Sequence, residues 1–250
     1  LVSLQPILVA IGAVYDSPAY HAFLHQFDHE VWEGFRLWDL IMPLFLFMTG
    51  ITIPFSLDSK RALPKAPIYR HIFRRVLILW LLGMVMQGNL LGFSWKSLFL
   101  YSNTLQSIAF GYLVTSILYL HFSMRTLMWV GLALLLAYTV PFMLTHDFSQ
   151  QGNFAIRVDK QLLGRFMDGV YWDEAGKWHF SNSYNYTWIW SSLTFSVTVM
   201  LGTLAGWIIK REHNTAPYRV LYKLLVIGFI ALFLGCLLHY QIPIIKRIWT

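Results

Sequence analysis

The sequence predicts an all-α membrane protein, a polytopic bundle of transmembrane helices. Only 12% of its 250 residues are charged, about half of the roughly 25% usual in soluble domains, while 57% are hydrophobic and the mean hydropathy is +0.53. So few charges could not cover the surface of a soluble 29.2 kDa chain. The same composition excludes disordered, collagen-like and coiled-coil proteins.

Long apolar runs predict the helices of this bundle in order. Crossing the hydrocarbon core takes about 20 largely apolar residues, and such runs lie at 37–57, 72–93, 104–120, 127–144, 186–209 and 220–239. The run at 1–14 is too short to cross alone, and we interpret it as the end of a truncated first helix. Hydrophobicity is still rising over 242–250, so further C-terminal helices are expected. We therefore predict one incomplete transmembrane domain over 1–250, with about seven spans.

Lysine and arginine predict the orientation, because membrane proteins keep these residues in short cytoplasmic loops. They gather in three alternate turns, at 58–75, at Arg125 and at 210–219. These turns are predicted to be cytoplasmic, and the loops 15–36 and 146–185 to face outside. The same rule explains the net charge of +7 without a nucleic-acid partner. We expect an integral membrane protein surrounded by membrane lipid.

The outer segment 146–185 is rich in aromatic residues, and it has two interpretations. It is either an aromatic belt at the membrane interface or a lid whose rings stack on a sugar or another flat acceptor. Its aromatic residues include Tyr171, Trp172, Trp178, Phe180 and Tyr184.

Metal and nucleotide motifs are absent from the sequence. The single cysteine, Cys236, cannot form an intrachain disulfide, and no Cys/His spacing typical of zinc occurs. P-loop, dinucleotide-binding and HExxH motifs are missing as well. We therefore expect no metal site.

The stretch 27–50, FDHEVWEGFRLWDLIMPLFLFMTG, places polar side chains against the outer end of the span at 37–57. Histidine can take and return a proton near neutral pH or carry an acyl group. Asp39 falls in the first helical turn, where a carboxylate is favoured and could orient an imidazole. His29 is therefore a candidate catalytic residue, with a solvated loop histidine as the alternative. Spacing alone does not separate it from His21 and His25.

This stretch resembles the signature H-x-x-W-x-G-x4-D-x3-P-x-F-x-F-x2-G. The signature belongs to the membrane acetyltransferase family of heparan-alpha-glucosaminide N-acetyltransferase and its bacterial relatives. The matching residues are His29, Trp32, Gly34, Asp39, Pro43, Phe45, Phe47 and Gly50. Weaker similarity continues in order over nearly the whole chain, through Arg74-Arg75, Leu105-Gln106, Asn153, Asp159, Leu163-Gly164 and Gly202…Gly206. The sequences at 33–40 and 167–172 are similar to those of a bacterial branch of that family.

The resemblance implies an enzyme that moves acetyl from cytoplasmic acetyl-CoA to an amino sugar or glycan outside the cell. In a bacterium it would lie in the inner membrane. The family's active-site histidine matches His29 and lies on the extracytoplasmic side, where the charge pattern also places His29. Two departures leave the acceptor open. Ser107 stands where arginine often follows Leu-Gln, and the tetrapeptide at 185–188 replaces an acidic motif.

Other site residues are expected on chemical grounds or from the resemblance. The Trp32 side chain could shield the site from water. Arg74 and Arg75 could bind the CoA phosphates bidentately, although positive-inside topology alone also explains them. Gln106 could hold a thioester carbonyl, because an amide inside a span needs a partner. The matched residues Asn153 and Asp159 are expected to bind substrate.

Small residues recur in the span 186–209. Gly202 and Gly206 form a small-xxx-small pair, which predicts a helix contact. A polar stripe is explained by the same packing, or alternatively by a seam beside an acyl-transfer path. Its members are Thr187, Ser191, Thr194 and Thr198.

We therefore expect a membrane acetyltransferase that uses acetyl-CoA, with His29 as base or acyl carrier. A transporter or flippase for a sugar or lipid-linked glycan is the main alternative, but it predicts charged residues at mid-membrane, and the spans carry almost none. A structural scaffold would leave the polar cluster around His29 and Asp39 unexplained. Direct transfer, two-step transfer and association into a homo-oligomer all stay open.

Overall fold

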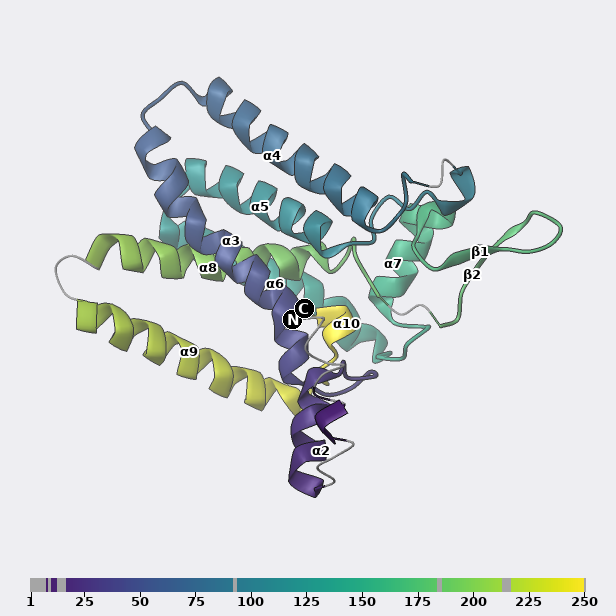
Figure 1. The fold of residues 1–250 in the computed structure, drawn as a ribbon. Coiled ribbons are helices and arrows are strands. Elements are labelled where there is room, and N and C mark those ends of the chain that lie inside the picture. The colour runs from purple at the N-terminus through teal and green to yellow at the C-terminus, as the bar shows by residue number, and fades with distance from the viewer. Residues whose placement is uncertain are drawn as a thin grey trace.

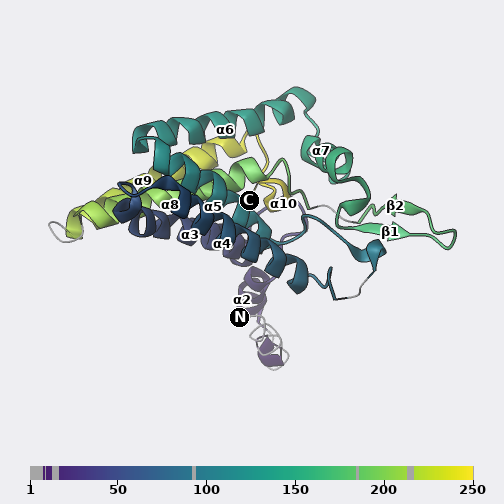
Figure 2. The same cartoon turned by 90° about the horizontal axis from the view of Figure 1, so that it is seen from above.

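The computed structural model describes residues 8, 10–12, 17–91, 94–183, 186–212 and 217–249, and this part of the chain is mostly helical (Figure 1). The long helices pack into a bundle, with α7 and the strands β1 and β2 at one end of it and α2 projecting separately (Figure 2). The α-helices are α2 (Pro18–Leu24), α3 (Ile41–Leu57), α4 (Lys65–Met86), α5 (Thr104–His121), α6 (Met124–Thr145), α7 (Phe154–Leu163), α8 (Ser192–Glu212), α9 (Pro217–His239) and α10 (Lys246–Trp249). Short 3-10 helices are η1 (His25–Phe27), η2 (Leu37–Leu40), η3 (Asp58–Lys60), η4 (Trp95–Ser97) and η5 (Gly164–Phe166).

Four helical segments among the described residues are long and apolar enough to cross a membrane, namely Leu37–Lys60, Met124–Thr145, Ser192–Glu212 and Pro217–His239. They coincide with four of the predicted spans, so the helical prediction is confirmed and the prediction of a membrane protein is supported. Helices α4 and α5 match the spans predicted at 72–93 and 104–120, but they do not belong to this set of four. The count of about seven spans is therefore not reproduced. Most of the predicted first span, 1–14, lies outside the described residues.

Side-chain caps explain where two of these helices begin. Asn103 Oδ1 accepts a hydrogen bond from the Leu105 amide at 2.8 Å, at the start of α5. Ser123 Oγ accepts from the Thr126 amide at 3.2 Å, at the start of α6. Each cap satisfies one of the amides that the first helical turn leaves without a partner.

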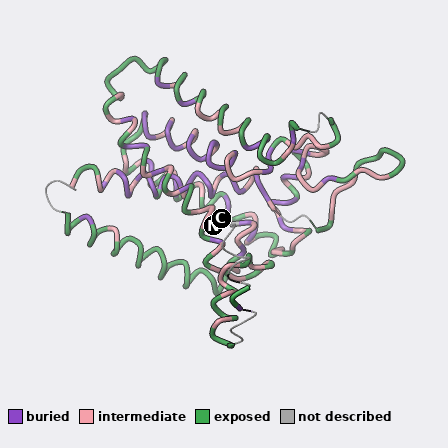
Figure 3. Tube along the Cα trace, in the orientation of Figure 1, coloured by how far each residue is buried: buried purple, intermediate pink, exposed green. Residues whose placement is uncertain are grey.

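Helix α8 is the centre of the bundle, and α3, α5 and α6 pack around it. Within its most apolar window, 67% of α8 is buried, whereas only 6% of the corresponding window of α9 is buried. Helix α9 therefore lies on the outside, and its exposed trace is visible in Figure 3. A helix this apolar and this exposed suits contact with lipid.

Glycines let α3 and α8 approach each other closely. A Cβ placed on Gly50 would lie 2.0 Å from the Val199 carbonyl oxygen, and one on Gly202 would lie 2.0 Å from the Phe47 carbonyl oxygen. Thr203 Oγ1 donates to the Gly50 carbonyl at 3.2 Å across the same contact. The helix contact predicted from the small-residue pair in α8 is confirmed.

The polar stripe divides into two parts: Thr187 and Ser191, before α8, donate to the carbonyls of Arg247 and Ile248, whereas Thr194 and Thr198 bond along their own helix. Thr194 Oγ1 donates to the Ser191 carbonyl at 2.8 Å, and Thr198 Oγ1 donates to the Thr194 carbonyl at 3.0 Å. These bonds favour the packing interpretation for this part of the stripe. Thr187, at its start, lines the cavity described below.

The segment 146–185 contains a short β-hairpin that the sequence analysis did not predict. Strands β1 (Val170–Trp172) and β2 (Trp178–Phe180) pair antiparallel, with Tyr171 opposite His179. The turn is stabilised by the Asp173 carboxylate, which accepts from the Lys177 amide at 2.8 Å, and by Gly176 at a φ of 77°. The hairpin projects away from the helical bundle (Figure 1).

Candidate active site

A cavity of about 790 Å³ opens where the ends of several helices meet. Its walls come from η2 and the start of α3, the end of α4, the start of α5, the segment before α8, and α10. Most of the wall is apolar or aromatic. Its imidazole and charged side chains, among the described residues, are His29, Asp168, Lys246 and Arg247. A concave apolar site with a few convergent polar groups is the usual form of a small-molecule site.

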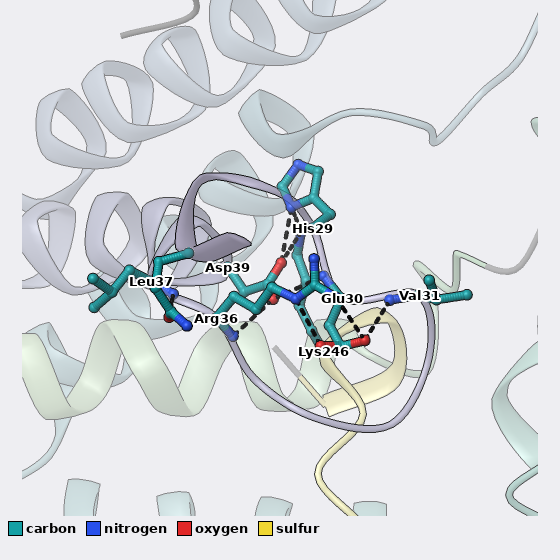
Figure 4. Close-up of polar contacts among 8 residues, drawn as sticks. His29, Glu30, Val31, Arg36, Leu37, Asp39 and Lys246 are labelled. Carbon is teal, nitrogen blue, oxygen red and sulfur yellow. Dashed lines mark hydrogen bonds and ion pairs between the residues drawn. The ribbon is translucent and has the colours of Figure 1, made fainter. Parts of the chain in front are cut away.

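His29, Asp39 and Lys246 form one cluster at the wall of this cavity (Figure 4). His29 Nδ1 lies 2.8 Å from Asp39 Oδ1 and 3.0 Å from Lys246 Nζ. Lys246 Nζ also lies 3.2 Å from Asp39 Oδ1. The Asp39 side chain is 0% exposed and that of Lys246 13%, whereas the His29 side chain is 47% exposed. The imidazole is thus open to a ligand, while its two partners are held behind it.

The loop before α3 holds the Asp39 carboxylate in place. Asp39 Oδ2 accepts from the Glu30 amide at 3.3 Å and from the Arg36 amide at 3.1 Å. Arg36 in turn binds the Glu30 carboxylate with two bonds, of 2.7 and 3.2 Å. The Arg36 guanidinium holds the pKa of Glu30 below its usual range. The loop is therefore closed by an ion pair, and Asp39 can orient His29 as the sequence analysis expected.

Lys246 reaches the cluster because the segment after α9 folds back onto the bundle. Gly34 donates its amide to the Ile244 carbonyl at 2.9 Å, and its φ of 125° is one that favours glycine. The Ile248 carbonyl accepts from Ser191 Oγ at 2.8 Å and from the Tyr138 hydroxyl. The segment is thus attached to the His29 loop, to α6 and to the start of α8.

The structure separates the three neighbouring histidines. His21 lies in α2 and His25 in η1, and both are exposed away from the cavity walls. His29 is the histidine of this group that lines the cavity.

Trp32 and Gln106 lie in structural positions. The Trp32 indole donates to the Phe148 carbonyl at 3.0 Å and packs against a separate buried cluster that includes Phe142. Trp38, rather than Trp32, lines the cavity. Gln106 is fully buried, and its amide bonds the Ser102 amide and the Leu100 carbonyl, both at 2.9 Å. Both side chains therefore stabilise neighbouring loops through hydrogen bonds to their backbone.

Asn153 and Asp159 are also satisfied within the fold. Asn153 caps α7, with its Oδ1 accepting from the Ile156 amide at 2.9 Å. Asp159 is fully buried and accepts from the amides of Trp188 at 2.6 Å and Ile189 at 3.0 Å. Neither residue lines the cavity, so the structure does not bring them to the place where a substrate would contact His29. Asp159 instead orders the segment that leads into α8.

Burial raises the pKa of Asp159 to about 7, against the opposing effect of the amides that bond it. The folded protein therefore binds a proton more tightly than the unfolded chain, whose value is near 3.8. Stability from this group is present below about pH 4 and is lost as the pH rises to about 7. We expect Asp159→Asn to remove this loss, a slope of at most about 1.4 kcal/mol per pH unit.

Thermal unfolding of both proteins in detergent, at several pH values from 4 to 8, measures this difference. Asp159→Asn will also lower the stability overall, because an amide offers one acceptor oxygen to these backbone amides instead of two. Parallel pH profiles for the two proteins would contradict the assignment.

Arg74 and Arg75 lie apart from the cavity on α4. The Arg75 guanidinium stacks 4.4 Å from the centre of the Tyr112 ring, while Arg74 is exposed in a shallow groove with Trp80. Twelve residues separate Arg75 from Gln87 at the cavity wall, which is about 18 Å along a helix. The structure therefore does not bring the two arginines to His29.

Sequence reasoning missed Lys246 and Arg247. Lys246 is 217 residues from His29, and no local spacing signals such a contact. The Arg247 guanidinium lies 4.9 Å from the centre of the Tyr186 ring, beside the cavity. Of the described part of the segment 146–185, Asp168 alone lines the cavity, so the aromatic hairpin does not cover it.

Comparison with family models and with curated proteins finds no match for this chain.

Proposed function

We propose that this protein is a membrane acyltransferase that moves an acetyl group from acetyl-CoA to an amino sugar or glycan, with His29 as the base or acyl carrier. The observation that carries the proposal is the 2.8 Å contact between His29 Nδ1 and the buried Asp39 carboxylate at the wall of a large cavity. An imidazole held at one nitrogen by a carboxylate, and open to a cavity at the other, is a common arrangement for proton transfer.

The chemical step follows from this arrangement. The amine nitrogen of the acceptor attacks the thioester carbonyl carbon, the C–N bond forms, and the C–S bond breaks. The amine proton passes to His29 Nε2 and then to the departing thiolate, so the products are an acetylated amine and CoA. The Trp38 ring in the cavity wall is the candidate surface on which a sugar would stack.

The proposed topology has about seven spans and places the cavity on the extracytoplasmic side of a bacterial inner membrane. Its support is that the cavity wall is built from helix ends that the charge pattern assigns to one side. These are the start of α3, the end of α4 and the starts of α5 and α8. Acetyl-CoA would enter from the cytoplasm, where Arg74 and Arg75 remain candidates for its phosphates.

Labelling of single introduced cysteines tests this topology in cells. We expect a membrane-impermeant thiol reagent added outside to label cysteine at positions 28 and 168, and not at position 62. The native Cys236 is exposed and must be replaced first. Labelling at position 62 alone would show that the orientation in the membrane is the reverse of the proposed one.

Acetyl transfer tests the function directly. Purified protein in lipid nanodiscs is incubated with radiolabelled acetyl-CoA and a panel of amino sugars, with heat-treated protein as the control. We expect labelled acceptor with at least one amino sugar. If the protein instead moves an unmodified sugar across vesicle membranes without labelling it, the transporter or flippase alternative replaces the proposal.

A further inference from the structure

Three polar atoms meet at the His29 ring, and they cannot all be satisfied at once. Nδ1 of His29 lies 2.8 Å from Asp39 Oδ1 and 3.0 Å from Lys246 Nζ. A carboxylate only accepts hydrogen bonds, and a lysine ammonium only donates them. Nδ1 of a neutral imidazole either donates or accepts, according to which ring nitrogen carries the proton.

Two arrangements follow for the neutral ring. When Lys246 donates to Nδ1, the ring proton is on Nε2, and the ammonium bridges Nδ1 and Asp39. When the ring proton is on Nδ1, it bonds to Asp39, and two donors would face each other over the 3.0 Å to Lys246. The first arrangement in turn leaves two acceptors, Nδ1 and Asp39 Oδ1, 2.8 Å apart, with the ammonium bonded to both. Lys246 therefore decides between the two, because without its ammonium only the second arrangement gives Nδ1 a hydrogen-bond partner in this cluster. Figure 4 shows the second ring nitrogen of His29 pointing away from this cluster.

We propose that Lys246 is a positioning residue that selects the tautomer of His29. With its ammonium on Nδ1, Nε2 carries the proton and acts as a hydrogen-bond donor toward the cavity. With the ammonium withdrawn, Nδ1 donates to Asp39, and Nε2 becomes a base. Only the consequence for acyl transfer depends on the proposed function, because the tautomer is a property of the cluster itself.

Of the two partners of His29, Lys246 has the longer and more flexible side chain. Asp39 Oδ2 is fixed by two backbone amides, whereas Lys246 ends a long side chain with rotatable bonds. The other charged groups near the ring are the Glu30–Arg36 pair, which is closed on itself, and Asp168 and Arg247 in the cavity wall. Among these groups, Lys246 is the cation within hydrogen-bond distance of His29.

Nitrogen NMR of the ligand-free protein tests this assignment without any enzyme assay. The chain contains nine histidines, so 15N-histidine protein in nanodiscs is compared with His29→Gln to identify the His29 signals. Spectra are recorded at about pH 8.5, where imidazoles are neutral and lysine remains charged. We expect the proton on Nε2 in the wild-type protein and on Nδ1 in Lys246→Met.

Two further variants separate tautomer selection from a merely structural role. Lys246→Arg keeps a cationic donor and should keep the proton on Nε2. Asp39→Asn keeps Lys246 and replaces the charged acceptor that competes for the ring with a weaker, neutral one, so it too should keep the proton on Nε2, even if Lys246→Met does not fold. The same tautomer in wild type and Lys246→Met, or a proton on Nδ1 in Asp39→Asn, would overturn the proposal. An inactive protein with the expected tautomers would count against acyl transfer alone.

Discussion

We expect His29→Ala to keep its fold and its binding of acetyl-CoA but to lose at least about a hundredfold in turnover, since removing a general base typically costs 10²–10⁴ in rate. The His29 side chain is 47% exposed, so its removal leaves little buried volume empty. The measurement is the rate of acetyl transfer at saturating substrate, with thermal unfolding in detergent as the check on folding. Asp39→Asn should lose less, because an asparagine oxygen can still hold the ring.

His21→Ala and His25→Ala are matched controls for this prediction. Both residues are neighbouring histidines that do not line the cavity, so both variants should retain activity close to wild type. Normal turnover in His29→Ala, together with an inactive His25→Ala, would move the active site to the other histidine. Equal, small losses of turnover in all three variants would show that none of these histidines takes part in the chemical step.

Among the substitutions considered, Gly202→Ala should cause the largest loss of stability. Its new Cβ would lie 2.0 Å from the Phe47 carbonyl oxygen, a backbone atom that moves only if α3 moves with it. Overpacking of a well-packed core costs about 1–3 kcal/mol and occasionally more. We expect the upper end of this range or beyond, because the obstacle is a helix and not a flexible side chain. Thermal unfolding in detergent, followed by circular dichroism, measures the loss.

Glycines of α9 provide the matched control. An ideal Cβ on Gly228 or Gly235 has nothing within 4 Å of it in the described structure. Alanine is favoured over glycine in a helix by roughly 0.5–1 kcal/mol, so Gly228→Ala and Gly235→Ala should leave the protein as stable as before or slightly more so. If all three variants were equally stable, the close contact between α3 and α8 would be wrong.

Composition and hydropathy by themselves determined the protein class and the positions of the long helices. The run predicted at 220–239 is found as α9 (Pro217–His239), and the run at 104–120 as α5 (Thr104–His121). Agreement of this kind is expected, because the backbone hydrogen bonds of a helix form within one segment of the chain, and the length of an apolar run can be read directly from that segment. The pairing of Asp39 with His29 could also be predicted from the sequence, since the two residues are ten positions apart, in a loop and in the first turn of the helix that follows it.

Other features depended on where distant segments meet. Asp159 matched a position expected to bind substrate, but its carboxylate is used by amides about thirty residues further along the chain. Trp32 donates to a carbonyl 116 residues away, so it packs against a separate buried cluster instead of shielding the site. The segment interpreted as an interface belt or a lid contains a hairpin that projects away from the bundle, and its base is held by Val170, which packs in the buried core.

The tertiary structure alone decided the composition of the candidate site. Lys246 meets His29 and Asp39 only because the segment after α9 folds back and is held by Gly34, Ser191 and Tyr138. The sequence indicated that Asp39 could orient an imidazole, but it could not name a lysine 207 positions further along the chain as the second partner of that carboxylate. Helix position is a local property of hydropathy, whereas the partner of a polar side chain depends on the path of the whole chain.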